Sequence, residues 1–141
     1  MQLNDLDAVL AIDLLSFPTP AKLKMYQYEL TQNALSHYQV LLDGDVLIGY
    51  SGFWMIADEC HISSIAIHPD WRGRNLGDQL LRYMLDCARE HKPILATLEV
   101  RRSNIVAQTL YHQHGFAIVG ERRRYYRDTN EDAILMTREP L

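Results

Sequence analysis

The segment HPDWRGRNLGDQLL, residues 68–81, constrains the fold more than any other part of the chain, because a glycine-bearing loop runs directly into a helix there. At about 100° per residue from Gly77, apolar and polar side chains separate onto opposite arcs. The apolar arc contains Leu80, Leu81, Met84, Leu85, Cys87 and Ala88. An apolar run of strand length, His61–Ile67, precedes the loop. The segment therefore predicts a strand, a loop, and a helix that packs on a sheet.

The loop between this strand and this helix has the chemistry of an anion site. Consecutive backbone N–H groups at a helix N-terminus, with the helix dipole behind them, bind phosphate. Arg72 and Arg74 would add cationic donors. On the loop pattern alone, an ordinary connection with solvated arginines is an equally good interpretation. A Walker loop and a dinucleotide fingerprint are excluded, because Gly-Lys-Ser/Thr and the required glycine spacing are absent.

The remaining elements follow from periodicity and turn residues. Helices are expected at residues 4–16, from a cap at Asn4 to the break at Phe17-Pro18, at 21–32 and at 103–114. Strands are expected at residues 39–42 and 46–50 around a turn at Gly44, and at 94–100, 116–126 and 133–137. Alternating strands and helices in the second half require crossover connections. We therefore expect an α/β or α+β fold, with helices on the faces of a mixed sheet.

Composition limits the number of domains and the partners. A chain of 141 residues has room for one domain, so residues 1–141 are expected to form a single domain. A net charge of −4, from 14 basic and 18 acidic side chains, argues against binding nucleic acid or an anionic membrane through bulk charge. Cys60 and Cys87 form no Cys-x-x-Cys motif, the N-terminus is not a secretory signal, and no apolar run approaches the ~20 residues of a membrane span. A cytoplasmic protein with reduced thiols is expected.

The loop resembles the acetyl-CoA loop of the Gcn5-related N-acetyltransferases (GNAT), which has the pattern Arg/Gln-x-x-Gly-x-Gly/Ala. Arg72-Gly73-Arg74-Asn75-Leu76-Gly77 matches it, except that Asn75 stands where the family usually has glycine. Asparagine is the next-best residue for a left-handed backbone, so the loop can keep its shape. The resemblance implies the GNAT fold, a mixed but mostly antiparallel sheet of about six to seven strands with about four flanking helices.

Further motifs are similar to those of the RimI-type N-terminal acetyltransferases within this family. In chain order they are Ser64-Ile65-Ala66-Ile67-His68-Pro69, Leu98-Glu99-Val100-Arg101-Arg102-Ser103-Asn104, Leu110-Tyr111 with Gly115-Phe116, Arg122-Arg123-Arg124-Tyr125-Tyr126, and Glu131-Asp132-Ala133. The similarity covers most of the chain from about Gly49 onward. Before that point Ser16-Phe17-Pro18 fits, whereas Ala21 replaces a tryptophan that is common there.

This resemblance implies acetyl-CoA as cosubstrate and no metal. It places Glu99 as the base for the acceptor amine and Tyr111 as the acid for the leaving thiolate. The backbone N–H of Ile67 would hold the thioester carbonyl, and Asn104 would support the pantetheine arm or the acceptor. The residues expected to contact acetyl-CoA are Ile65, Ala66, Ile67, Arg72, Gly73, Arg74, Asn75, Leu76, Gly77, Asp78, Asn104 and Tyr111.

Glu99 also has an ordinary structural interpretation. It lies near the end of the apolar strand ILATLEV, where an unpaired carboxylate is costly unless it is solvated or used. A strand-end glutamate that faces water, paired with Arg101 or Arg102, is favoured when the residues are considered without the resemblance. The match to the family's glutamate reverses that preference.

Tyr111 has two interpretations as well. On its helix it shares an edge with Asn104 and Gln108, beside an arc that is expected to pack on the sheet and contains Val106, Ala107 and Leu110. Its ordinary pKa near 10 exceeds that of a thiol, about 8.5, so the phenol stays protonated and can donate. Without the resemblance, a half-buried tyrosine bonded to a backbone carbonyl is the commoner case.

Two other residue clusters are weaker indications of a functional site. His112 and His114 point about 200° apart on a helix and no His-Glu-x-x-His motif exists, so no metal site is expected. The arginines at 122–124 and 127 around Tyr125-Tyr126 resemble an RNA-binding patch. In a strand they alternate between faces, and the resemblance instead places this hairpin beside an acceptor peptide. A solvated strand face remains the plain alternative.

Taken together, the motifs favour an acetyl-CoA-dependent N-α-acetyltransferase. In the RimI-type family the acceptor is the N-terminal alanine of a small-subunit ribosomal protein, so such a protein is the expected partner, with no direct nucleic-acid or membrane binding. A lysine or small-amine acetyltransferase is the alternative within the same class. A non-catalytic domain that senses acetyl-CoA is the alternative from another class, but a sensor needs neither Glu99 nor Tyr111.

Overall fold

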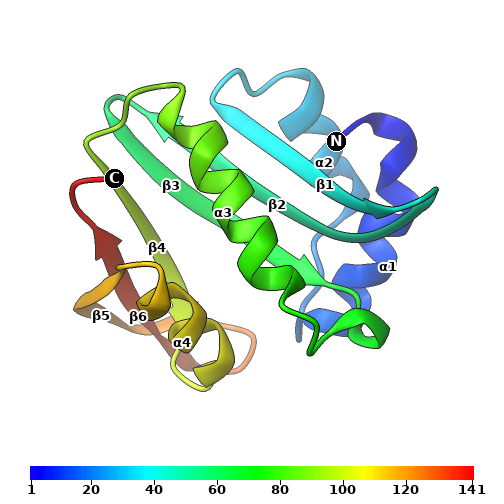
Figure 1. The fold of residues 1–141 in the computed structure, drawn as a ribbon. Coiled ribbons are helices and arrows are strands. Elements are labelled where there is room, and N and C mark those ends of the chain that lie inside the picture. The colour runs from blue at the N-terminus through cyan, green and yellow to red at the C-terminus, as the bar shows by residue number, and fades with distance from the viewer.

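Six strands form one continuous sheet in the computed structural model, which describes residues 1–141. Helices α1 and α2 lie on one face of this sheet, and α3 and α4 lie on the other (Figure 1). The elements in chain order are α1 (Leu6–Ser16), α2 (Leu23–Thr31), β1 (Ser36–Asp43), β2 (Val46–Ile56), β3 (Glu59–Ile67), α3 (Leu76–Arg89), β4 (Leu95–Arg101), α4 (Ile105–Gln113), β5 (Ala117–Tyr126) and β6 (Glu131–Arg138).

This architecture confirms the expected mostly antiparallel sheet with four helices, and the number of strands is six. The expected elements are all present, although the second strand continues well past Tyr50. The cap at Asn4 is wrong. Residues Leu3–Asp5 form a 3-10 turn ahead of α1, and the carboxylate of Asp5 accepts the N–H of Gln2 at 2.7 Å. None of the helices has both the length and the apolar character needed to cross a bilayer.

The strand order is β1-β2-β3-β4-β6-β5, and only the central pair, β3 and β4, is parallel. This parallel ladder joins residues 59–61 to residues 95–97 and then stops. Beyond it the two strands diverge toward the carboxyl end of β3 (Figure 1). From Ile62 to Ile67, β3 therefore has a free edge in the middle of the sheet.

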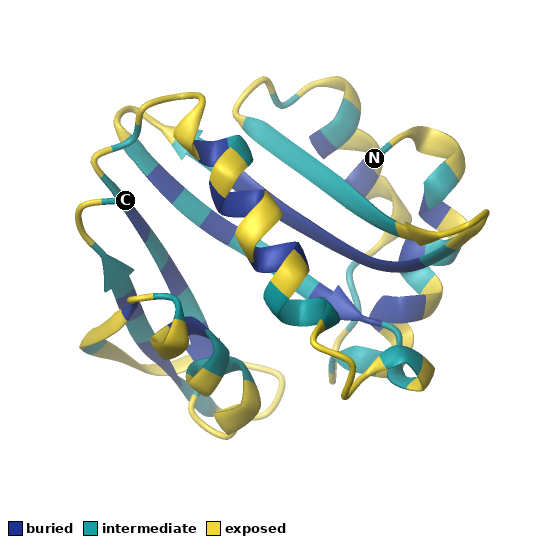
Figure 2. Cartoon of the chain, in the orientation of Figure 1, coloured by how far each residue is buried: buried dark blue, intermediate teal, exposed yellow.

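Two apolar cores flank the sheet. The larger joins α3 and α4 to β2, β3, β4 and β6, and the smaller joins α1 and α2 to β1, β2 and the end of β3. Because helices cover both faces of β2, it is buried without interruption from Ile48 to Phe53 (Figure 2). Burying one side chain such as Leu81, which is fully inaccessible, contributes roughly 1.5–3 kcal/mol. The helices therefore hold β3 and β4 in place although the strands are paired over only a short stretch.

A bulge in β3 decides which side chains face which core. The register with β2 shifts between Ser64 and Ile62, so Ser63 is the extra residue. Before the bulge Ile62 joins the α3 core, and after it Ala66 joins the α1–α2 core. Strict alternation would have put both residues on one face.

His37 provides a test of this fold by pH. Its ring stacks on Phe53 at 4.9 Å and lies 4.4 Å from the ring of His91. Burial first, and then the nearby His91, lower the pKa of His37. The unfolded chain therefore takes up this proton first, and stability should fall as pH drops below about 6.5. We expect His37→Gln to reduce the loss of stability between about pH 7.5 and about pH 5.5, measured by urea unfolding. An equal loss in both proteins would contradict the expectation.

Candidate active site

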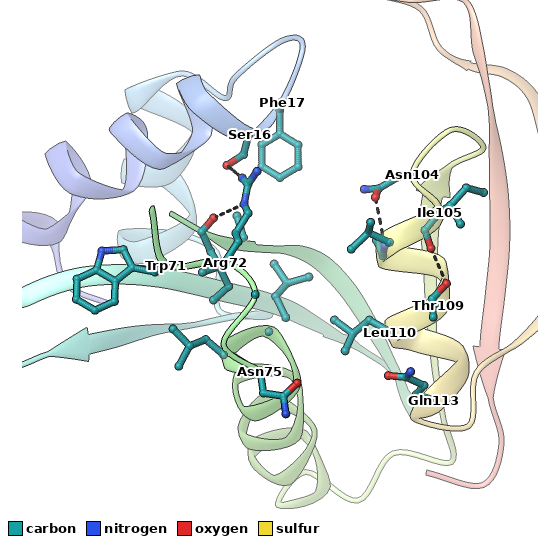
Figure 3. A pocket seen from close by; sticks show the side chains of 18 residues that line it. Ser16, Phe17, Trp71, Arg72, Asn75, Asn104, Ile105, Thr109, Leu110 and Gln113 are labelled. Atoms are coloured by element: carbon teal, nitrogen blue, oxygen red, sulfur yellow. Dashed lines mark hydrogen bonds between the residues drawn. The ribbon is translucent and has the colours of Figure 1, made fainter. Parts of the chain in front are cut away.

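The divergence of β3 and β4 connects two cavities on opposite faces of the sheet. The larger, about 800 Å³, lies between the loop before α3 and one side of α4 (Figure 3). The smaller, about 310 Å³, lies on the side of α1 and α2. Four residues line both cavities: Phe17, Ile65, Asn104 and Ala107. The two cavities therefore adjoin each other at the gap between β3 and β4.

The loop before α3 presents unpaired N–H groups to the larger cavity. No partner within the chain accepts the N–H groups of Gly73 through Asp78, and the first helical bond is Gln79 N–H to Asn75 O, 3.2 Å. Gly73 and Asn75 have φ angles of 79° and 60°, so both are left-handed. The backbone shape expected for Asn75 is thus confirmed. Consecutive free N–H groups at the start of a fourteen-residue helix suit a diphosphate.

The two arginines of the loop differ from the expectation that both would be free cationic donors. Arg72 donates from Nε to the carbonyl of Ile67 and from Nη2 to the hydroxyl of Ser16, each at 3.0 Å (Figure 3). Arg74 lies over the ring of Trp71 at 5.0 Å and does not line the cavity. Arg72 therefore ties the loop to β3 and α1, and backbone groups dominate the anion site.

Asp78 is the last of the residues whose N–H group is unpaired, and its side chain links α3 to α4 beside the larger cavity. Its carboxylate is 2.6 Å from Nε2 of His114 and 3.1 Å from Nε of Arg82. His114 follows the last turn of α4, and its carbonyl accepts a hydrogen bond from Arg138. The pair Asp78–His114 thus joins α3 to α4 beside the cavity. Only the N–H of Asp78, and not its carboxylate, is available to a ligand.

Ile67 ends β3 just before the loop and lines the larger cavity. The N–H of His68 bonds to Ile48 O at 2.8 Å, toward β2. Because successive N–H groups along a strand point to opposite sides, the N–H of Ile67 points away from β2 and toward the gap. It has no partner in the chain. This geometry suits the expected role of holding a carbonyl oxygen.

Glu99 lines the smaller cavity from β4, where its side chain is 26% exposed. Its partner is Arg122 on β5, with Nε 3.3 Å from Oε1. The expected ordinary pairing with Arg101 or Arg102 is wrong. Arg101 instead pairs with Asp128 at 2.8 Å, and Arg102 is occupied by acidic residues of β5 and β6. Glu99 therefore remains open to a molecule in the cavity.

Tyr111 comes to the same cavity from the opposite face of the sheet, on α4. Its side chain is buried, and its ring packs edge-on against Phe116 at 5.8 Å. The structure contains no hydrogen bond from its hydroxyl, so the ordinary interpretation with a carbonyl partner is wrong. Burial, followed by the nearby phenol of Tyr126, raises the pKa of Tyr111 above its ordinary range. The phenol therefore keeps its proton and can donate it.

The side chains at the start of α4 do not all face the sheet as the sequence predicted. Val106 was expected on the arc that packs on the sheet, but it is 84% exposed and lines the larger cavity with Ile105. Ala107 and Leu110 do pack against the core. Asn104 caps the helix by accepting the N–H of Ala107 at 3.2 Å, which leaves its amide nitrogen free beside both cavities (Figure 3).

Three lining residues were not among those expected at the site, although Ser16 and Phe17 belong to the stretch that fits the RimI-type pattern. Ser16 and Phe17 reach the larger cavity only because the end of α1 lies beside the loop. Asp13 lines the smaller cavity and is fully buried. A detectable signal existed for Asp13, since it continues the buried stripe of Leu6 and Val9 at helical spacing. The structure brings no three potential metal-ligating side chains together.

Asn75 offers a direct test of the anion site. Because its φ is 60°, a β-branched residue there is strained by about 1–2 kcal/mol, whereas glycine is not. We expect Asn75→Val to weaken acetyl-CoA binding about tenfold and Asn75→Gly to bind within about twofold of the unmodified protein. Calorimetric titration with acetyl-CoA measures both. Tight binding by Asn75→Val would mean that this loop does not hold the ligand.

Comparison with known proteins relates this arrangement to one family. The model of the acetyltransferase (GNAT) family matches residues 6–116. A Bacillus subtilis (strain 168) protein, provisionally named a ribosomal protein bS18-alanine N-acetyltransferase, is 39% identical over 96% of this chain and 90% of its own length. The N-alpha-acetyltransferase RimI of Mycobacterium tuberculosis is 39% identical over 74% of this chain and 66% of its own length.

A solved structure shows the same likeness in three dimensions. The crystal structure of the ribosomal-protein-S18-alanine N-acetyltransferase from Escherichia coli superposes with a TM-score of 0.89 at 28% identity. The match covers 99% of this chain and 90% of that one. The likeness therefore extends over the sheet and both helical layers.

Proposed function

This chain belongs to the acetyltransferase (GNAT) family, and from that premise we propose that it transfers an acetyl group from acetyl-CoA to the N-terminal α-amine of a protein. The acceptor we propose is the N-terminal alanine of a small-subunit ribosomal protein, as the names of the Bacillus subtilis and Escherichia coli relatives suggest. The observation that carries the proposal is the opening between β3 and β4, which joins an amide-lined cavity to a second cavity containing Glu99.

In this proposal the larger cavity holds acetyl-CoA. The free N–H groups of residues 73–78 bind the diphosphate, and the apolar side chains of Ile105 and Val106 line the path of the pantetheine arm. The N–H of Ile67 donates to the thioester oxygen and stabilises the negative charge that develops on it. Asn104 stands where the two cavities join and can donate to either substrate.

Glu99 and Tyr111 then move the protons. An α-amine has a pKa of about 7.7–8.0, so a large part of it is protonated near neutral pH and must lose a proton before it attacks. Glu99, held by Arg122 but open to the smaller cavity, accepts that proton directly or through water. The neutral amine attacks the thioester carbon to form a tetrahedral intermediate, and the C–S bond breaks as Tyr111 donates its proton to the leaving sulfur. The nitrogen then loses its remaining extra proton, which restores the phenol of Tyr111, and Glu99 releases the first proton to solvent.

A peptide panel tests the acceptor. Release of CoA is measured with peptides that differ only in their first residue, together with an N-terminally blocked peptide that contains lysine. We expect the highest kcat/KM with N-terminal alanine and no release with the blocked peptide. Activity on the blocked peptide alone would contradict N-terminal acetylation and favour the lysine acetyltransferase.

The same assay separates an enzyme from a sensor. Binding of acetyl-CoA without release of CoA to any acceptor would support a sensing domain. We also propose that the protein acts in the cytoplasm, where a ribosomal acceptor would be found. Acetylation of bS18 only in cells that contain this protein would support both the proposed acceptor and the proposed location.

A further inference from the structure

Three oxygen-bearing side chains meet in the wall of the smaller cavity, and none of them has a role in the mechanism above. Asp13 comes from α1, Tyr26 from α2 and Tyr50 from β2, and their exposed fractions are 1%, 2% and 0%. Tyr50 also lies 2.9 Å from the hydroxyl of Ser64 on β3. The cluster thus joins four elements around the cavity. Asp13 forms no ion pair.

Counting protons in this cluster indicates the state of the carboxyl group. The Tyr26 hydroxyl is 2.6 Å from Oδ2 of Asp13 and 3.1 Å from the Tyr50 hydroxyl, and Tyr50 contacts Oδ1 of Asp13. These three contacts form a closed ring, and each needs one proton between its oxygens. The two phenols supply only two. If Asp13 were ionised, the contact between the phenols would have no proton, and if Asp13 carries a proton, all three are hydrogen bonds.

The surroundings favour the uncharged carboxyl group. Burial raises the pKa of Asp13, while hydrogen bonds from Tyr26, Tyr50 and the Ala21 backbone oppose this without cancelling it. Burial also raises the pKa of both phenols, so each keeps its proton. Besides these two, the titratable group facing Asp13 is the phenol of Tyr38, and no basic side chain does. An unpaired carboxylate at this depth would be costly.

We propose that Asp13 is protonated and closes a hydrogen-bonded ring with Tyr26 and Tyr50. This ring holds the side chains of Tyr50 and Ser64 in position, so that they form an uncharged wall of the acceptor cavity. The part of the proposal that concerns the acceptor rests on the proposed function. Tyr26 would be the donor to Oδ2 if Asp13 were ionised. In the proposed ring this one bond is reversed, so that Asp13 donates to Tyr26, while Tyr26 donates to Tyr50 and Tyr50 donates to Oδ1.

The ring leaves one carboxylate in the acceptor cavity. Asp13 and Glu99 are the only acidic residues that line it, and their environments differ. Asp13 is buried among phenols, whereas Glu99 is partly exposed and faces the guanidinium of Arg122. The burial that keeps Asp13 uncharged therefore does not extend to Glu99. Glu99 is then the single base available to an amine, and a charged lysine side chain finds no second anion there.

Difference infrared spectroscopy tests the protonation directly and needs no activity. The spectrum of the unmodified protein minus that of Asp13→Asn, near neutral pH, should contain the C=O band of a protonated carboxyl. Glu29→Gln is the matched control. Glu29 is also buried, but its carboxylate accepts from Trp54 Nε1 and Asn33 Nδ2, which are nitrogen donors only, so no such band should be lost. Absence of the band in the first difference spectrum overturns the proposal.

Stability against pH gives a second readout of the same proton. An acid whose pKa is raised in the folded state contributes stability below its unfolded pKa of about 3.9, and this contribution is lost as pH rises through the folded pKa. The side-chain amide that Asp13→Asn introduces cannot titrate, so the urea midpoint of this variant should rise relative to the unmodified protein between about pH 5 and about pH 9. If the difference in urea midpoint between Asp13→Asn and the unmodified protein does not change with pH over this range, the proposal is overturned.

Acceptor kinetics test the positioning role. Tyr50→Phe breaks the hydrogen-bonded ring and keeps the aromatic side chain, so we expect the KM for the acceptor peptide to rise about fivefold or more, with the KM for acetyl-CoA unchanged. Asp13→Asn can still donate and accept, and should keep the acceptor KM within about twofold. An unchanged acceptor KM in Tyr50→Phe overturns the positioning role. If no peptide is acetylated at all, the proposed function fails, and the infrared and stability results still decide the ring.

Discussion

Replacing Glu99 by glutamine should lower kcat by about 10²-fold or more near neutral pH, because the acceptor amine then loses its base. The loss should shrink at about pH 9, where the amine is mostly neutral without help, since its pKa is about 7.7–8.0. The binding of acetyl-CoA should not change, because Glu99 lines only the acceptor cavity. The measurement is the pH profile of kcat/KM for a peptide with N-terminal alanine.

Glu121→Gln is the matched control for this experiment. Glu121 also carries an arginine partner, Arg102 at 2.5 Å, but it lies on β5 outside both cavities. Its substitution should leave the pH profile unchanged. A Glu99→Gln protein with the same profile as the unmodified enzyme would exclude Glu99 as the base.

Replacing Tyr111 by phenylalanine should lower the rate of the chemical step by about 10²-fold while acetyl-CoA still binds. The variant loses only a hydroxyl that has no partner in the chain, so the fold should keep its stability. The defect should become smaller above about pH 8.5, where a thiolate can leave without a proton. Single-turnover rates at saturating acceptor measure this step.

Tyr83→Phe on the outer side of α3 is the control, since that side chain is 59% exposed and lines neither cavity. It should behave as the unmodified enzyme. Full single-turnover activity in Tyr111→Phe would remove this residue from the mechanism, and a loss of acetyl-CoA binding would make it a binding residue instead.

Much of the fold could be predicted because its signals are local. The amphipathic pattern of α3 depends only on the spacing of side chains along one helix, and the structure places the helix at Leu76–Arg89. The left-handed backbone of Asn75 is likewise a property of one residue and its neighbours. The proline at position 18 ended α1 for the same kind of reason.

The partners of side chains could not be predicted in this way. Glu99 pairs with Arg122, which lies two strands away in the sheet order, instead of with the arginines next to it in the chain. Arg72 bonds to Ser16, which is 56 residues away. The bulge at Ser63 changed the faces of β3 because of its register with β2.

The sequence by itself therefore determined the elements, their order, the shape of the loop and the identity of the chemical groups. Only the tertiary structure decided that β3 and β4 separate after a short parallel ladder, that two cavities meet in the gap, and that Asp13, Tyr26 and Tyr50 form a buried ring. The physical reason is one of range. Backbone conformation and periodicity depend on neighbours in the chain, whereas cavities, ion pairs and protonation depend on contacts between elements far apart in the sequence.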